Sequence, residues 1–235
     1  MLRKLIKFSL KKEKDNVSLQ EQNNMIMENN EKECVIGIDI GMKGGISVFA
    51  RENKSQEFKL VDLIHMPVVK GVRTSRRFSN FINPGMLVII LKNQQQKFGK
   101  VTVVFEDIGS IFKIHKHTMY SLGRQRGVIE GICNALHIKM YSINPRIWQK
   151  YISSLPESQQ QENTEQSKSK KKTKYLSYNT FIKLFPEYKE KVIGKRGFKD
   201  GLTDSALIAY YYINEVYGKE KQSQEVQTSV QESGN

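Results

Sequence analysis

Short apolar runs separated by turn residues mark the strands that the chain is expected to form. Val35–Ile40 is such a run, and the glycine after it indicates a buried strand. Ile46–Arg51 and Glu57–Met66 follow after short turns, so these segments predict an antiparallel meander. Val101–Phe105 is continuously apolar, which predicts an internal strand covered on both faces. Ile138–Ser142 predicts a further strand.

Helical segments follow the meander and separate the later strands. Asn-Pro pairs begin two of them, because Asn accepts a hydrogen bond at a helix start and Pro fits the first helical position. The expected helices cover residues 85–97, 117–136, a segment after Asn144-Pro145 that carries Trp148, residues 176–185 and residues 201–217. A meander followed by strands that alternate with helices predicts one mixed α/β sheet with helices on both faces.

Composition sets the limits of this domain. Residues 34–217 carry the alternating pattern, whereas 156–174 are polar without periodicity and predict a disordered insert. Residues 1–33 predict a basic arm and linker, and 218–235 predict a disordered tail. Residues 1–14 hold six Lys or Arg interleaved with apolar residues, which fits an organelle presequence and a disordered arm equally. We expect an intracellular protein of the mitochondrion, the nucleus or the cytoplasm.

The charge of the chain favours a polyanionic partner. Lys and Arg number 38 against 24 Asp and Glu, which gives a net charge of +14. Such an excess is typical of proteins that bind nucleic acid or an anionic surface, although an ordinary basic protein also fits. No apolar run reaches the roughly 18 residues of a membrane span, so we expect no membrane partner. Cys34 and Cys133 have no metal-type spacing and are expected to be buried free thiols.

Four acidic residues occupy positions that suggest a shared site. Asp39 interrupts the first strand and Glu106 ends the run Val101–Phe105, which predicts that they lie on neighbouring strands. Asp200 and Asp204 are four residues apart and share one face of the last helix, although Asp200 also fits a simple helix cap. Oxygen ligands are those that Mg²⁺ prefers, and two ions about 4 Å apart support phosphodiester hydrolysis. The adjacent Asp107 is expected to point the opposite way.

The glycines around Asp39 allow a second function class. Gly37, Gly41 and Gly44-Gly45 fit a close backbone approach, as in the hairpin that cradles ATP phosphates in actin-like kinases. That fold requires a second, duplicated domain, for which the foldable part of this chain is too short.

Five motifs in order along residues 35–215 support a named resemblance. They are Val35–Gly41, Val104–Asp107, Tyr120–Gly131, Asn144–Lys150 and Asp204–Ala209. With them the chain resembles the RuvC-type Holliday junction resolvases of the RNase H-like superfamily. The resemblance implies an RNase H-like mixed five-stranded sheet, and a homodimer that cuts four-way DNA junctions symmetrically in recombination and repair. It also implies that the acids Asp39, Glu106, Asp200 and Asp204 are catalytic and bind two Mg²⁺ ions, for which Mn²⁺ can substitute.

The same resemblance suggests contacts to DNA and to a second subunit. Residues 108–117 would form a loop that enters the junction, where Phe112 would stack at the crossover unless it packs locally. Gly123 and Gly127 would allow a close helix–helix contact between subunits unless they pack on their own sheet. The candidate phosphate contacts, each of which also fits a merely solvated charge, are Lys113, His115, Lys116, His117, Arg124, Arg126, Arg146 and Lys150.

Two features depart from the family or leave its activity open. Many relatives place the last two acids three residues apart, whereas the residue three before Asp204 is Gly201 and Asp200 is four before it. A further interpretation is a catalytically inactive relative kept as a nucleic-acid-binding or structural subunit, although the retention of all four acids argues against it.

Overall fold

A mixed five-stranded sheet forms the centre of the protein. The structure is a computed structural model that describes residues 32–71, 80–107, 115–159, 170–194 and 197–219. The strands of the sheet, in spatial order, are β3 (Lys59–His65), β2 (Gly45–Arg51), β1 (Glu33–Ile38), β6 (Lys100–Glu106) and β7 (Lys139–Ile143). β2 runs antiparallel to β1 and β3, whereas β1, β6 and β7 are parallel. This arrangement confirms the mixed five-stranded α/β sheet that was expected.

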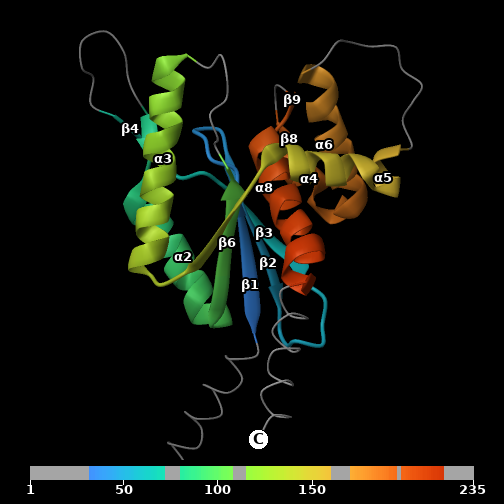
Figure 1. Cartoon of the computed structure of the whole chain (residues 1–235), viewed down its shortest axis with the longest axis horizontal. Helices are drawn as coiled ribbons and strands as arrows, with labels where there is room; N and C mark the ends of the chain where they lie inside the picture. The colour runs from blue at the N-terminus through green and yellow to red at the C-terminus, as the bar shows by residue number, and fades with distance from the viewer. Residues whose placement is uncertain (1–31, 72–79, 108–114, 160–169, 195–196, 220–235) are drawn as a thin grey trace, which may run out of the picture.

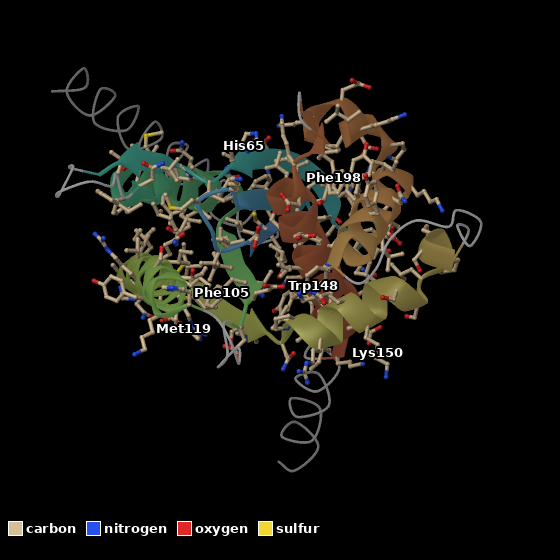
Figure 2. The ribbon with its side chains drawn as sticks, turned by 90° about the horizontal axis from the view of Figure 1, so that it is seen from above. His65, Phe105, Met119, Trp148, Lys150 and Phe198 are labelled. Atoms are coloured by element: carbon tan, nitrogen blue, oxygen red, sulfur yellow. The ribbon has the colours of Figure 1, made fainter. Side chains whose placement is uncertain are left out.

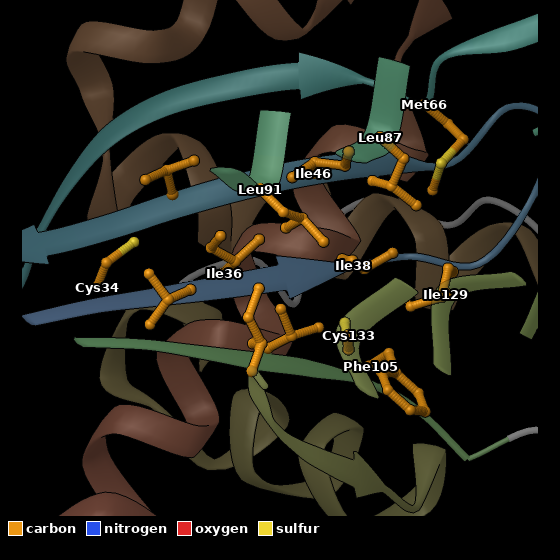
Figure 3. Close-up of a cluster of buried hydrophobic side chains, with 14 of the residues drawn as sticks. Cys34, Ile36, Ile38, Ile46, Met66, Leu87, Leu91, Phe105, Ile129 and Cys133 are labelled. Carbon is orange, nitrogen blue, oxygen red and sulfur yellow. The ribbon is translucent and has the colours of Figure 1, made fainter. Parts of the chain in front are cut away.

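Helices cover both faces of the sheet (Figure 1). One face carries α2 (Pro84–Phe98) and α3 (Lys116–Ala135), and the other carries α4 (Pro145–Ser154), α6 (Lys170–Leu184) and α8 (Asp200–Tyr211). The two faces follow from the alternation of side chains along β1. Ile36 and Ile38 pack with Leu87 and Leu91 of α2 (Figure 3), whereas Val35 lies in the cluster beneath α8.

Several short elements were not expected from the sequence. They are the antiparallel pair β4 (Val68–Lys70) and β5 (Asn80–Ile82), the pair β8 (Ile193–Gly194) and β9 (Gly197–Phe198), helices α5 (Pro156–Gln159) and α7 (Lys189–Val192), and the 3-10 turn η1 (Pro186–Tyr188). The last helix also changes form, because α8 continues as the π-helix η2 (Tyr212–Tyr217).

The limits of the expected insert need correction. Its first residues form α5 and its last residues, 170–174, belong to α6, so only 160–169 lie outside the described residues. The expected arm at 1–31 and the tail from 220 also lie outside them, and both stay predictions. No helix in the described part of the chain is long and apolar enough to cross a membrane.

A buried ion network ties the end of η2 to the sheet. Glu33 is only 2% exposed and accepts hydrogen bonds from Arg51 Nε at 2.9 Å, Lys100 Nζ at 2.9 Å and the Tyr217 hydroxyl. The Arg51 guanidinium also lies 4.5 Å from the ring of Phe58. Burial alone would raise the pKa of Glu33, but the bonds from Tyr217, Lys100 and Arg51 lower it to about 2. The network therefore anchors η2, and with it α8, on β1 and β2.

Candidate functional site

Asp39 and Glu106 leave the sheet at the same end and on the same face. The parallel pairing of β1 and β6 sets Ile38 opposite Phe105, so Asp39 and Glu106, the next residues of the two segments, lie beside each other. Side chains alternate along a strand, and Val35 and Val104 lie in the cluster beneath α8. The same alternation directs Asp39 and Glu106 to the α8 side, and both are half-buried. The two strands are neighbours as predicted, with Glu106 the last residue of β6 and Asp39 the first residue after β1.

The turn that follows Asp39 packs directly against the start of α8. The Asp39 N–H donates to the Gly45 carbonyl oxygen at 3.0 Å, and Gly44 forms a β-bridge with Gly201. A Cβ atom on Gly45 would lie 2.5 Å from the Gly201 carbonyl oxygen, and one on Gly201 would lie 2.6 Å from Gly44 Cα. Only glycine permits this approach, which sets the first turn of α8 beside Asp39.

Asp200 and Asp204 are half-buried in the first turns of α8. The cap position is taken by Lys199, so Asp200 is the first residue of the helix and not its N-cap. A negative charge there is favoured by the helix dipole. Asp204 lies two turns before Tyr211, whose ring is 5.4 Å from that of Tyr151 on α4. Asp204 therefore belongs to the side of α8 that faces α4.

Trp148 of α4 fixes the Glu106 side chain. Its Nε1–H donates to Glu106 Oε1 at 2.9 Å, and the indole is only 2% exposed. Burial raises the pKa of the Glu106 carboxyl, and the bond from Trp148 opposes this rise. A half-buried carboxyl with a raised pKa is a common mark of a functional site. Figure 2 looks onto this end of the sheet and shows Trp148 directed towards the centre of the molecule.

Trp148 is a site residue that the pattern of the sequence does not identify. The only signal in the sequence is a single Trp on the helix after Asn144-Pro145, because an indole N–H needs a hydrogen-bond partner once it is buried. That partner is an acid 42 residues away in the chain, which periodicity does not identify.

Asp107 points to the opposite face, as predicted, and contacts α3. Arg126 donates from Nη1 to Asp107 Oδ1 at 2.6 Å and from Nε to Glu130 Oε1 at 2.7 Å, while its guanidinium lies 5.6 Å from the Phe105 ring. The hydrogen bonds that Arg126 donates to Glu130 and then to Asp107 raise its pKa. This candidate phosphate contact is therefore already engaged with two carboxylates of its own chain.

The other candidate DNA contacts are spread around this end of the protein. Arg124 on α3 is exposed and lies 5.0 Å from the Phe81 ring. His115 and Lys116 are exposed at the start of α3, and Arg146 and Lys150 are exposed on α4 (Figure 2 labels Lys150). The backbone of His117 lies in α3, and Phe112 and Lys113 fall outside the described residues. Their roles in binding DNA stay predictions.

The face of α3 that turns away from the sheet is lined with glycine. A Cβ atom added to Gly123, Gly127 or Gly131 would meet no atom within 4 Å, so these residues do not pack on their own sheet. Tyr120, one turn before Gly123, is 71% exposed. This face is open to a second helix.

The acids fit a hard divalent cation by chemistry and by backbone position. Four half-buried carboxylates lie at one end of the sheet, one directly after β1, one at the end of β6 and two on α8. Carboxylate oxygen is a ligand that Mg²⁺ prefers. Within the described ranges, however, no group of three or more His, Cys, Asp or Glu side chains is arranged to hold a metal ion. The four acids therefore lie on segments that meet at one end of the sheet. Their ligand role stays a prediction.

Comparison with known proteins finds similar folds but no match by sequence. No protein-family model matches the chain, and no curated protein matches it significantly. Among solved structures, the chain is similar to Thermus thermophilus RuvC bound to a Holliday junction substrate, with 11% identity, a TM-score of 0.41 and coverage of 80% of this chain and 96% of that one. It is also similar to fowlpox virus resolvase in complex with Holliday junction DNA, with 17% identity, a TM-score of 0.44 and coverage of 77% and 99%.

A second structure of Thermus thermophilus RuvC gives 15% identity and a TM-score of 0.42 over 76% of this chain and 94% of that one. At these TM-scores the likenesses carry no argument for an activity.

Proposed function

We propose that this protein is a divalent-metal-dependent nuclease that cuts four-way DNA junctions, a crossover junction endodeoxyribonuclease of DNA recombination and repair. The observation that carries the proposal is the meeting of Asp39 and Glu106, at the ends of paired parallel strands, with the acidic first turns of α8. The chain carries a net charge of +14, yet four acids lie together at one end of its sheet. A bound metal cation would offset the charge of the acids, and the basic residues would attract the phosphates of DNA.

Each acid has a distinct part in this proposal. Asp39 directly follows the central strand β1, beside the Glu106 strand and the start of α8, so it would be the residue best placed to hold the metal. Trp148 occupies Glu106 Oε1, so we assign Oε2 to the metal. Asp200 and Asp204 would complete the set from one helix face. Bound Mg²⁺, or Mn²⁺ in its place, would activate the attacking water and stabilise the leaving oxygen.

The glycine face of α3 supports a homodimer as part of the proposal. Gly123, Gly127 and Gly131 recur every four residues, so they form one open stripe along the helix. Without side chains, two such stripes can approach closely and bury the exposed Tyr120 rings beside them. A junction has two strands to cut, and a symmetric dimer would present one acidic site to each.

One observation favours a second candidate, a catalytically inactive subunit that binds nucleic acid. In the part of the chain that the structure describes, no group of three or more potential ligands is arranged to hold a metal. An inactive relative would keep the basic surface and the fold while losing the hydrolytic step. The kinase alternative has no such support, because the described residues build one five-stranded sheet and not the duplicated pair that such kinases use.

The candidates are separated by incubating the full chain with a labelled four-way junction, a linear duplex and an RNA–DNA hybrid, with and without Mg²⁺. We expect paired symmetric nicks in the junction alone and only with the metal. Cutting of the hybrid instead would point to a ribonuclease H activity. Tight binding to the junction without cutting in Mg²⁺ or Mn²⁺ would refute the nuclease and favour the inactive subunit.

A further inference from the structure

Cationic side chains gather beside the acidic site, at the end of the edge strand β3. The last residue of β3, His65, pairs with Gly45 at the start of β2, and Met66 N–H donates to the Gly44 oxygen at 3.1 Å. Gly44 in turn bridges to Gly201 of α8. The end of β3 therefore lies against the same turn that holds Asp39.

Two lysines from the segment before α8 reach this end of β3. Lys199 Nζ donates to the Lys191 carbonyl oxygen at 2.9 Å, and Lys191 Nζ pairs with Asp62 Oδ1 of β3 at 2.7 Å. Partial burial, and then the charges of Lys199 and Lys191, lower the pKa of His65, so the lysines' positive field reaches the imidazole. Lys43, exposed in the turn whose backbone meets Gly201, adds a further cation.

An exposed aromatic edge continues from these cations. Phe198 of β9, next to Lys199 in the chain, stacks on Tyr178 of α6 with ring centres 4.7 Å apart and planes at 21°. The Tyr175 ring meets Phe198 edge-on at 5.4 Å and is 57% exposed. Ile193, which pairs with Phe198 across the hairpin, is also 41% exposed. Figure 2 labels His65 and Phe198 near each other, above Trp148 in its view.

We propose that this surface, made of Lys43, His65, Lys191, Lys199, Tyr175 and Phe198 and here called the β3–β9 surface, binds an unpaired strand of the DNA substrate. Lys43 and Lys199 would hold its phosphates, since Lys191 is paired with Asp62 and the lowered pKa of His65 favours its neutral form, and the Tyr175–Phe198 edge would stack against a base. Sites for single strands combine a positive track with aromatic faces in this way. Bases inside a duplex are already stacked on each other, so the aromatic edge favours an unpaired strand over a duplex.

The inference rests on the proposed function in one respect, that the strand belongs to the DNA substrate. Binding of the strand itself needs neither the metal nor hydrolysis. The test is therefore a binding measurement in EDTA with the full chain. Fluorescence anisotropy would compare a labelled single-stranded oligonucleotide of about 16 nucleotides with a blunt duplex of the same sequence.

The aromatic part is tested by a matched pair of variants. Tyr175→Leu should weaken single-strand binding about fivefold or more, since one stacked base contributes about that much, and should leave duplex binding unchanged. Tyr175→Phe keeps the ring and should bind like the wild type. Equal affinity of Tyr175→Leu and the wild type for the single strand, or equal losses for strand and duplex, would overturn the proposal.

The cationic part is tested by the salt dependence of the same binding. Lys43→Gln should reduce the slope of log affinity against log salt by about 0.7, the value for one phosphate contact to a single strand. Lys59→Gln changes an exposed lysine at the opposite end of β3 and should leave the slope unchanged. Equal slopes for Lys43→Gln and the wild type would count against the track, and this arm stays decisive even if Tyr175→Leu fails to fold.

A crosslinking arm locates the strand directly. An oligonucleotide that carries bromodeoxyuridine should form adducts on peptides that contain Tyr175 or Phe198, and adducts found only elsewhere would overturn the assignment. The outcomes separate the two proposals. If Tyr175→Leu selectively loses single-strand binding and the wild type does not cut junctions, the β3–β9 surface is supported and the nuclease is refuted. If the wild type cuts junctions and Tyr175→Leu binds the single strand like the wild type, the nuclease is supported and the surface is refuted.

Discussion

The close packing of α8 against the Asp39 turn makes Gly201→Ala a demanding test of the site. The added Cβ would lie 2.6 Å from Gly44 Cα, whereas ordinary carbon contacts are about 3.5 Å or longer, so the helix and the turn would have to separate by about 1 Å. Overpacking of this kind costs about 1–3 kcal/mol, and the better helix propensity of Ala offsets at most about 1 kcal/mol. A misplacement of 1 Å at a reacting centre can lower the rate about 100-fold.

The assay combines urea unfolding with the rate of junction nicking in Mg²⁺. We expect Gly201→Ala to lose about 1–2 kcal/mol of stability and most of its activity, the loss of activity exceeding what the unfolded fraction explains. Gly85→Ala is the matched control, because its Cβ would make an ordinary contact at 3.6 Å and the residue is exposed on α2. Wild-type stability and nicking in Gly201→Ala would refute the contact between α8 and the Asp39 turn as the basis of the site.

Three further predictions follow from individual contacts. Glu33→Gln should cost about 3 kcal/mol near pH 7, because the drop in the pKa of Glu33 from 4.5 to about 2 stabilises the folded state by roughly that amount. The pKa is lowered on folding, so this stabilisation is present above pH 4.5 and is lost as the pH falls towards 2. In urea unfolding, the free energies of unfolding of wild type and variant should converge near pH 2. A difference that stays constant with pH would contradict the assignment. Trp148→Phe removes the donor to Glu106, so the acid limb of the pH–rate profile should move to higher pH, and an unmoved limb would exclude this role. Gly127→Leu should convert a dimer to monomers in sedimentation without loss of monomer stability, and a persistent dimer would place the interface elsewhere.

The long elements of the fold could be predicted because their sequences carry strong local signals. The apolar runs of β1, β2 and β6 and the Asn-Pro start of α2 gave strands and a helix within about two residues of their observed ends, the usual uncertainty of such boundaries. The pairs β4–β5 and β8–β9 were missed because two- and three-residue strands have no periodicity to detect. The start of α6 was missed because residues 170–174 are mostly Lys, which has good helix propensity but offers no apolar face.

The sequence allowed us to predict which strands and which helix carry the acids of the candidate site, but not the contacts between them. Asp39 and Glu106 could be placed at neighbouring strands because Asp39 interrupts the first apolar run and Glu106 ends the run Val101–Phe105, and the pairing of β1 with β6 confirms that these strands are neighbours. The bond from Trp148 to Glu106 and the glycine contacts that dock α8 depend on the tertiary arrangement of distant segments, which no local pattern encodes. The metal-ligand roles of the four acids rest on chemistry that the fold permits, and they stay predictions.

The most direct test of the central claim compares wild type and Asp39→Asn on a labelled four-way junction. Cutting is followed in Mg²⁺, and binding is measured separately in EDTA. We predict that Asp39→Asn abolishes cutting and binds the junction with nearly wild-type affinity, because contacts of Lys and Arg with phosphates supply most of the affinity. Cutting by Asp39→Asn at the wild-type rate would show that this carboxylate does not hold a catalytic metal, and would contradict the account.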